Sequence, residues 1–423
     1  MSVLEKNDKI ILFKKKEDCC ACGACYNICP KNAIEMEIDD YGFKYPKINE
    51  NKCIGCGACK KVCAFQNIKE TNEPLEILVS ARKDNSKILQ SASGGIFAVF
   101  AEKILKENGI VFGSALIEKN KILEPEHIYI DKLEDLPKLL GSKYVQSDIN
   151  STYKEARKFL SAGKKVLFSG TPCQIAGLKS FLGRKYDNLL TIDIICHGVP
   201  NAEFFKGYLK ILEKQIKAKI IDFKFRDKKY GWGPYTMCIK FKKDNKIENK
   251  YFSLEEASYP HMFLYTESLR ENCYRCKYTN KNRTGDITIG DYWGIENEHP
   301  DLLKENGGIL DRKKGISAII VNTEKGKVWL DKCKDELFLY SSTFEQVAKA
   351  NIQLREPSPY GKYRDKIMQL YKDGGYELVD KFYYNKVIIK YIKKILIKKT
   401  IKKIMPEKIW LILKSIYYSV KIK

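Results

Sequence analysis

Residues 19–30, CCACGACYNICP, place four cysteines at the spacing C-x2-C-x2-C-x3-C and end in a proline. Residues 53–63, CIGCGACKKVC, repeat this spacing, although Ala64 stands where the proline would follow. Three thiolates on one tightly turning loop can reach three corners of a cubane, while the fourth must arrive from elsewhere. Glycines inside both loops let the backbone approach the sulfides closely. The two runs therefore predict iron-sulfur ligation.

The pairing of the two runs follows the bacterial ferredoxin pattern for two [4Fe-4S] clusters, in which the fourth cysteine of each run binds the other cluster. The alternative is one or two zinc sites, but zinc modules usually pair two C-x2-C units across a long spacer. Cys20 is an adjacent spare. We expect the ligands of one cluster to be Cys19, Cys22, Cys25 and Cys63. We expect those of the other to be Cys53, Cys56, Cys59 and Cys29.

The distribution of cysteines also indicates the cellular compartment of the protein. Of 15 cysteines in 423 residues, nine fall between Cys19 and Cys63, unlike a secreted disulfide framework. The start of the chain lacks the uninterrupted apolar stretch of a signal peptide, and no run reaches the length of a transmembrane helix. We therefore expect a reducing cytoplasmic location.

About half of the formal charge of +23 comes from the C-terminal segment. Residues 381–423 hold 13 lysines against one acidic residue, Glu407, mixed with apolar and aromatic residues at roughly helical spacing. This pattern is typical of a basic amphipathic helix lying on an anionic membrane surface. A terminal helix packed on its own domain fits the same residues, so both interpretations stay open. No recognisable binding motif accompanies the charge, and we expect no nucleic-acid partner.

The order of segments predicts an α+β chain of three parts. Residues 1–70 form a two-cluster ferredoxin-type domain, which contains two short strands around a turn at Gly42. Residues 77–330 alternate strands with helical segments, which indicates βαβ units and an α/β domain with a mixed or largely parallel sheet. Residues 331–423 are mostly helical and basic.

Four of the six remaining cysteines could lie close together in the folded chain. Cys173 follows the strand KKVLFSG, with Thr171 as the expected N-cap and Pro172 at the first helical position. Cys196 ends the apolar strand NLLTIDII. Ligands of open α/β sheets bind beyond the carboxyl ends of strands, so these two thiols converge on one edge. The loop ENCYRCKYT supplies a C-x2-C pair to join them.

We therefore predict a third [4Fe-4S] cluster on Cys173, Cys196, Cys273 and Cys276. Three alternatives stay open. The same four thiolates could bind zinc instead. Cys196 could be an ordinary buried residue. Cys173 could be a nucleophile whose pKa is lowered at a helix N-terminus. The last two cysteines are expected to be structural: Cys238 and Cys333.

Residues 90–105, QSASGGIFAVFAEKIL, place small residues ahead of an apolar helix. Free backbone N–H groups at such a start suit a phosphate, which makes Ser93, Gly94 and Gly95 candidate cofactor-binding residues. The alternative is that this segment is only a turn, since it lacks the G-x-G-x-x-G spacing of a dinucleotide-binding loop. Lys143 is a candidate anion partner, or a solvated surface lysine.

The chain resembles the coenzyme F420 hydrogenase/dehydrogenase beta-subunit family, in its version with an N-terminal two-cluster ferredoxin domain. The matching stretches span most of residues 77–320 in the family's order: SASGGIF, GSKYVQSD, GTPCQIAGL, DIICHGVP, FRDKKYGWG, CYRC and RTGDITIGDYWG. The resemblance implies a flavoprotein, normally with FAD, that moves electrons between iron-sulfur centres and a two-electron carrier. In that family the Ser-Gly-Gly segment is similar to part of the flavin region, and GTPCQ to part of the inner cluster site.

The resemblance leaves the substrate open, because relatives act on F420 in archaea or a chlorophyll derivative in plants, and similar chains occur in bacterial polysaccharide gene clusters. We expect an iron-sulfur flavoprotein oxidoreductase that exchanges electrons between a ferredoxin or similar redox protein and F420 or another small substrate. His197 is a candidate proton donor, with a structural role at a strand end as the favoured alternative. The second hypothesis is a non-catalytic electron relay that docks on a partner enzyme or membrane complex.

Overall fold

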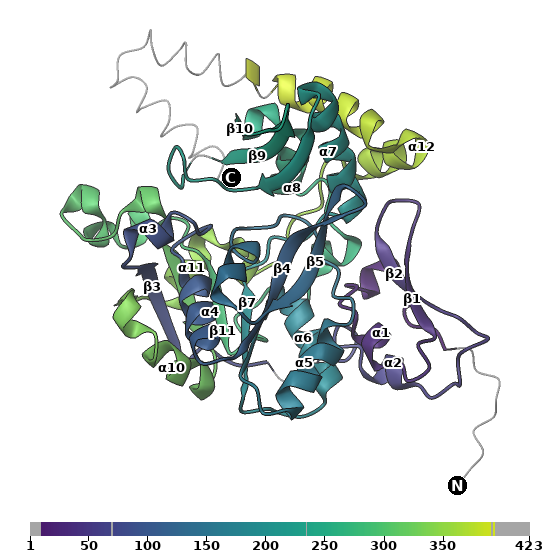
Figure 1. Ribbon diagram of the computed structural model, residues 1–423, viewed down its shortest axis with the longest axis horizontal. Helices are drawn as coiled ribbons and strands as arrows, with labels where there is room; N and C mark the ends of the chain where they lie inside the picture. The colour runs from purple at the N-terminus through teal and green to yellow at the C-terminus, as the bar shows by residue number, and fades with distance from the viewer. Residues whose placement is uncertain (1–9, 69–70, 234, 391, 394–423) are drawn as a thin grey trace, which may run out of the picture.

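Three sheets organise the computed structural model (Figure 1). An N-terminal unit lies at one end, an eight-stranded sheet with its helices forms the centre, and a smaller sheet packs with helices beside it (Figure 1). The structure describes residues 10–68, 71–233, 235–390 and 392–393.

The N-terminal unit contains the predicted hairpin, in which Gly42 turns the chain with φ +82°. Both of its α-helices begin directly after a left-handed glycine, Gly23 or Gly57. That conformation strains any residue with a Cβ, so the glycines permit each cysteine loop to turn into its helix. The unit comprises η1 (Lys16–Asp18), α1 (Ala24–Ile28), β1 (Ile34–Ile38), β2 (Lys44–Ile48) and α2 (Ala58–Lys61).

The central sheet is mixed, as expected. Strands β4, β6, β7 and β11 are parallel neighbours in that order, and the remaining pairings are antiparallel. In spatial order the strands are β13 (Leu337–Ser341), β3 (Glu76–Arg82), β12 (Ser317–Val321), β11 (Ile287–Asp291), β7 (Leu189–Ile194), β6 (Val166–Gly170), β4 (Ile110–Lys119) and β5 (Ile122–Ile130).

Helices cover both faces of this sheet because its strands are apolar on both sides. Leu167 faces one core and its neighbour Phe168 faces the other, as alternation along a strand requires. The first core receives α4 (Ile96–Lys106) and α10 (Glu324–Asp331), and the second receives α5 (Thr152–Ser161) and α6 (Pro172–Leu182).

The α/β fold extends beyond residue 330, where the sequence pattern placed its end. The short strand β13 pairs antiparallel with β3 and forms one edge of the central sheet. Its sequence, LFLYS, follows the lysine-rich α10 and is only five residues long, so the pattern alone assigns it to a helical region. The neighbouring short helices are α3 (Asn85–Ile88), α9 (Ile295–Glu298) and α11 (Phe344–Ala350).

A second, antiparallel sheet has its own aromatic core. The ring centroid of Phe205 lies there 5.3 Å from that of Phe223 and 5.6 Å from that of Tyr259. The elements are α7 (Ala202–Ile216), β8 (Lys219–Lys224), β9 (Thr236–Lys243), β10 (Lys246–Ser253), α8 (Ser258–Leu264) and α12 (Arg364–Tyr383). Short turns connect the fold: η2 (Leu133–Lys138), η3 (Leu254–Glu256), η4 (Glu271–Arg275), η5 (Pro300–Leu302), η6 (Lys304–Asn306), η7 (Arg312–Lys314), η8 (Lys334–Glu336), η9 (Ile352–Leu354) and the π-helical η10 (Tyr384–Ile388).

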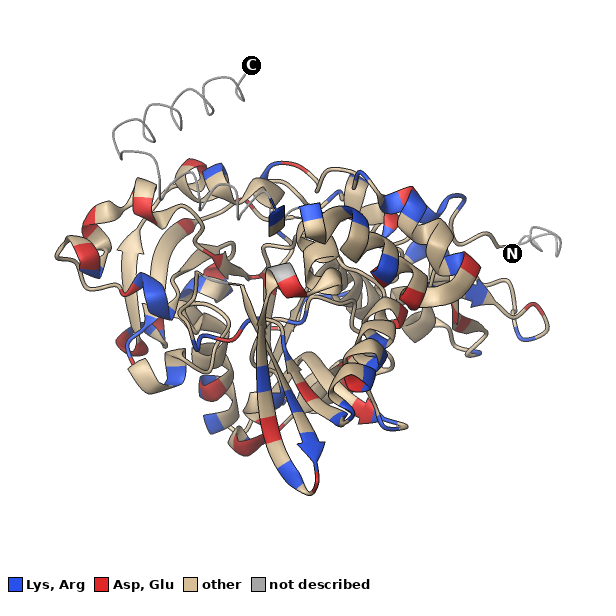
Figure 2. Cartoon of the chain, turned by 90° about the horizontal axis from the view of Figure 1, so that it is seen from above, with Lys and Arg blue, Asp and Glu red and all other residues tan. Residues whose placement is uncertain are grey.

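Basic and acidic residues are interspersed over the part of the chain that the structure describes (Figure 2). None of the described helices is both long and apolar enough to cross a membrane. Most of the basic segment proposed for a membrane surface, residues 394–423, lies outside the described residues.

Candidate functional site

The eight cysteines of the two runs lie around two neighbouring cavities. The fourth cysteine of each run lies with the first three of the other run, as their spacing predicts. Cys59 lines both cavities. We call the first four the middle cysteine set: Cys19, Cys22, Cys25 and Cys63. We call the second four the outer cysteine set, in which Cys56 is exposed: Cys29, Cys53, Cys56 and Cys59.

The middle cysteine set packs directly against α6. A Cβ built on Gly177 of that helix would lie 2.9 Å from the Sγ of Cys22 and 3.0 Å from the hydroxyl of Tyr153. Any larger residue at position 177 would therefore separate the N-terminal unit from the helix. The glycine lets the cysteine loop approach the central sheet closely.

The same helix begins at the edge of the sheet where β6 and β7 end. It starts at Pro172 with Thr171 as N-cap, as predicted, and the hydroxyl of Thr171 lies 3.2 Å from the Sγ of Cys173. Because β6 and β7 are parallel neighbours, their carboxyl ends bring Cys173 and Cys196 to one side.

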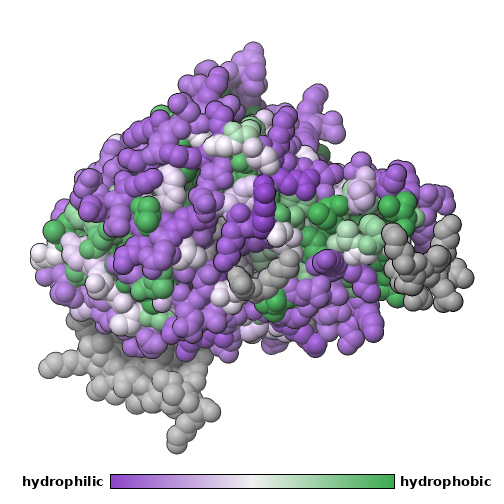
Figure 3. All heavy atoms as spheres, turned by 90° about the horizontal axis from the view of Figure 1, so that it is seen from below, coloured by the Kyte–Doolittle hydropathy of each residue, from purple (hydrophilic) through white to green (hydrophobic). Residues whose placement is uncertain are grey.

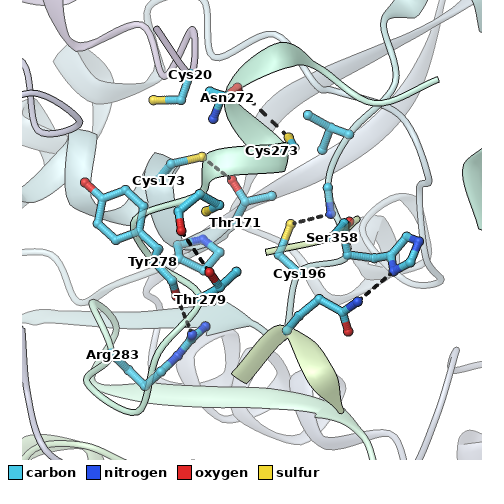
Figure 4. A pocket seen from close by; sticks show the side chains of 16 residues that line it. Cys20, Thr171, Cys173, Cys196, Asn272, Cys273, Tyr278, Thr279, Arg283 and Ser358 are labelled. Atoms are coloured by element: carbon cyan, nitrogen blue, oxygen red, sulfur yellow. Dashed lines mark hydrogen bonds between the residues drawn. The ribbon is translucent and has the colours of Figure 1, made fainter. Parts of the chain in front are cut away.

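The four predicted cysteines, which come from three distant segments, line one cavity at this edge. Figure 4 shows Cys173, Cys196 and Cys273 around a common space, with Cys20 to one side of it. The spare Cys20 thus lines this cavity as well as that of the middle set. We call the four predicted residues the inner cysteine set: Cys173, Cys196, Cys273 and Cys276.

Burial and hydrogen bonding separate the pKa values of these thiols. A hydrogen bond from Cys20 lowers the pKa of Cys173 to about 7, in spite of burial and with help from Thr171. Burial raises the pKa of Cys273 to about 12 and that of Cys276 to about 11. Burial also raises the pKa of Cys196. At neutral pH these three clustered thiols are therefore held as neutral S–H groups or need a positive centre between them.

A buried ion pair fixes the sheet edge behind the inner set. Asp193, with a fully buried side chain, lies 3.3 Å from the guanidinium of Arg283. Its carboxylate also accepts hydrogen bonds from Thr284, Gly285 and Thr288. Arg283 in turn donates to the carbonyl of Tyr278 and lines the thiol cavity. The loop that carries Cys276 is thereby tied to β7.

Among the described residues, no three His, Cys, Asp or Glu side chains are close enough to hold a single metal ion. A cubane binds its cysteines at four separate irons, so its ligands stand further apart than those of one ion. The three cysteine sets fit that donor chemistry, with four thiols each around a cavity.

A larger cavity of about 570 Å³ adjoins the inner set and shares Cys173, Cys196 and His197 with it. Its size is that of a typical cofactor site. Of the predicted phosphate residues, Ser93 and Gly95 line it. Gly94 does not, because it is pressed between two strands: its added Cβ would lie 2.8 Å from the carbonyl of Ser80.

Lys143 lines the same cavity, but its ammonium group donates 2.7 Å to the carbonyl of Leu140. Burial lowers the pKa of Lys143 to about 7. His197 is also already engaged: one ring nitrogen lies 3.2 Å from the carbonyl of Phe263 and the other 3.1 Å from the amide of Gln353. Burial lowers the pKa of His197, so the ring is neutral at pH 7. These contacts favour the structural role at the strand end.

Sequence reasoning missed an aromatic wall of the large cavity, to which Tyr235 and Trp293 contribute lining residues. The guanidinium of Arg226 lies 4.7 Å from the ring centre of Tyr235 and 5.3 Å from that of Trp293. Trp293 stacks on Trp232 at 4.6 Å, and the indole N–H of Trp232 donates 3.1 Å to Asp291. The only signal for this wall was that Arg226, Trp232 and Trp293 belong to the stretches FRDKKYGWG and GDYWG.

Lys228 was missed as well. Its ammonium group donates to the carbonyls of Ile88 and Ser93 at 2.7 and 2.6 Å, and burial lowers its pKa to about 7. These two hydrogen bonds fix the loop of small residues that precedes α4. No spacing rule connects residue 228 to residue 93.

Two family models match the chain. Residues 163–347 match the C terminus of the beta subunit of coenzyme F420 hydrogenase/dehydrogenase, and residues 18–67 match a 4Fe-4S dicluster domain. No curated protein matches. A chain in a solved structure of the F420-reducing [NiFe] hydrogenase complex from Methanosarcina barkeri is similar, with 14% identity, 72% of this chain and 94% of that chain covered, and a TM-score of 0.42. The two family matches confirm the resemblance that the sequence motifs indicated.

Proposed function

We propose that this chain, which joins a 4Fe-4S dicluster domain to the C-terminal domain of a coenzyme F420 hydrogenase/dehydrogenase beta subunit, is an iron-sulfur flavoprotein oxidoreductase. It would hold three [4Fe-4S] clusters on the outer, middle and inner cysteine sets. It would hold FAD in the large cavity. Its reaction would pass electrons between a ferredoxin-like carrier and a small two-electron substrate such as F420.

One observation carries the proposal: neighbouring cavities share residues in a row. Cys59 lines the outer and middle cavities, and Cys20 lines the middle and inner cavities. Cys173 and Cys196 line the inner and the large cavity. A row of adjoining sites from the surface to a cofactor-sized cavity is what electron transfer requires.

The large cavity fits a flavin by its chemistry. The loop before α4 offers small residues and backbone N–H groups, which suit a phosphate. Arg226 also lines the cavity, where its guanidinium lies 3.4 Å from the carboxylate of Asp291. A flavin supplies the exchange between one-electron and two-electron chemistry. The protein's part is to bind it beside Cys173 and Cys196 and to surround it with apolar side chains such as Phe97.

The outer set is where a carrier protein would dock. Cys56 is exposed, and Ile54 beside it is 59% exposed. Apolar atoms gather at the end of the molecule that holds the N-terminal unit (Figure 3). Exposed lysines surround the outer set and suit an acidic ferredoxin: Lys31, Lys52, Lys60 and Lys61.

Anaerobic purification followed by iron, sulfide and flavin analysis tests the proposal. We expect about twelve irons and one FAD per chain, since each cubane holds about four irons. Cys173→Ser should lose about four irons. Cys333→Ser, a buried cysteine outside all three sets, is the matched control and should lose none. Full iron in Cys173→Ser with lost activity would instead identify Cys173 as a nucleophile.

A second pair of variants tests the flavin site. Ala92 lines the large cavity in the loop before α4. Ala92→Asp places a carboxylate where a phosphate would bind and should lower flavin content, while the isosteric, neutral Ala92→Asn should retain it. Equal flavin in both variants would contradict the phosphate position. Iron-loaded protein without any flavin would favour the electron relay.

A further inference from the structure

The inference concerns Arg270, a fully buried arginine between the middle and inner cysteine sets. Its side chain reaches the N-terminal unit: Nε donates 3.0 Å to the carbonyl of Cys19, and a terminal nitrogen donates 2.7 Å to the carbonyl of Lys44. The other terminal nitrogen donates 3.1 Å to Gln146, whose amide donates to the carbonyl of Cys20. The guanidinium thus touches the backbone of the first cysteine loop.

The backbone of Arg270 forms hydrogen bonds with the segments that carry residues of the inner cysteine set. Its N–H donates 2.9 Å to the carbonyl of Val199, in the loop that follows Cys196. Its carbonyl accepts a hydrogen bond of 2.9 Å from the N–H of Cys273. One residue therefore contacts the segments that carry ligands of both sets.

The charge of Arg270 has no carboxylate partner within the described part of the chain. Glu271, the next residue in the chain, pairs with another arginine and lies 3.1 Å from Arg364, and Glu17 lies 2.8 Å from Arg275. The guanidinium instead packs over the ring of Tyr45, at 4.1 Å from its centre. A buried cation without a counter-ion is costly unless an anion is supplied.

We infer that Arg270 is a shared positive charge that raises the reduction potentials of the clusters on the middle and inner cysteine sets. A [4Fe-4S] cluster on four thiolates is an anion, and the electron it gains on reduction adds a further negative charge. A buried cation close to two such groups stabilises the reduced forms of both. The lysines around the outer set are exposed, so water screens their charges. The potential therefore falls off toward the surface, and electrons from a low-potential carrier move inward.

This inference rests on the proposed function for the inner cluster, and the test separates the two. The full chain is purified anaerobically and titrated with dithionite, a one-electron donor, while the clusters are followed by electron paramagnetic resonance. Cys56→Ala and Cys273→Ala assign the signals of the outer and inner clusters. Iron content decides the number of clusters independently of any potential.

Arg270→Gln should keep the iron and lower the potentials of the middle and inner clusters, while that of the outer cluster stays unchanged. Arg270→Lys, which keeps the charge, should hold all three near the wild-type values. The matched control replaces the neighbouring neutral pair, Arg364→Gln with Glu271→Gln, and should change no potential. Unchanged potentials in an iron-replete Arg270→Gln would overturn the inference, as would an equal shift of all three clusters.

If Arg270→Gln loses iron, the iron content of Arg270→Lys decides whether the charge of residue 270 is what the clusters require. Retained clusters in the lysine variant support the role of charge, and equal loss in both variants overturns it, because hydrogen-bond shape would then be the requirement. A wild-type content of about eight irons would remove the inner cluster from the proposed function. The potential of the middle cluster would still support or overturn the role of Arg270.

Discussion

The outer and inner cysteine sets hold the same four thiols but are built in different ways. Three residues of the outer set lie within seven positions of the chain, on a loop turned by its own glycines. The inner set draws Cys173 and Cys196 from two strand ends and a pair from a loop about 80 residues further on. The first is a property of a short segment, whereas the second depends on the whole central sheet.

The substitution expected to have the largest effect on this difference is Asp193→Asn. The substitution leaves the buried Arg283 without its counter-ion, which costs about 3–5 kcal/mol. Chemical denaturation should show that loss, and iron analysis should show the inner cluster lost with the outer and middle clusters kept. Asp187→Asn, in an exposed turn six residues away, should leave both measurements unchanged. Loss of all clusters together would break the comparison.

Gly177→Val tests the contact that joins the two kinds of site. The added side chain overlaps Cys22, and overpacking of this type costs about 1–3 kcal/mol. We expect a lower free energy of unfolding and slower electron transfer from the middle to the inner cluster after flash reduction. Gly233→Val, where an added Cβ meets no atom within 4 Å, is the control. Unchanged transfer rates in both would show that the contact is dispensable.

Iron removal sharpens the comparison without any substitution. The outer set includes the exposed Cys56, whereas Cys273 of the inner set is 9% exposed. Under a chelator and limited oxygen, the outer cluster should be lost first and the inner cluster last. Parallel samples of Cys173→Ser, which should lack the inner cluster, identify the slow phase. A slow phase that persists in this variant would contradict the assignment.

The smallest effect on stability is expected at the surface of the outer set. Ile54→Ser should change the free energy of unfolding by no more than about 0.5 kcal/mol. It should nevertheless slow reduction by ferredoxin, because the apolar contact beside Cys56 is lost. Ile247→Ser, 66% exposed on β10, removes the same apolar surface far from the outer set. Equal rates in the two variants would remove this surface from carrier docking.

The same contrast explains what could be predicted from the sequence. The ligand exchange between the two cysteine runs follows from local spacing, and the meeting of Cys173 with Cys196 follows from the rule that parallel strands end together. The chain order of strands and helices likewise indicated a mixed sheet.

Contacts between distant segments left no pattern in the sequence. Cys20 looked like a spare because its role as a neighbour of Cys173 depends on the docking of two domains. Arg270 and Lys228 are single basic residues whose partners lie far away in the chain. The strand β10 reads as a charged loop, since most of its residues face solvent. Such features are tertiary and need the folded chain.

The stacked pair Trp232 and Trp293 gives the large cavity an optical reporter. Only four tryptophans occur in the chain, and Trp293 lines the cavity directly. Trp329 lies on α10, is buried in a separate core and serves as an internal reference. A flavin absorbs where tryptophan emits, so its arrival would quench the stacked pair. Fluorescence titration of the whole protein can therefore follow occupancy of this cavity in real time, without isotopes, activity or a known substrate.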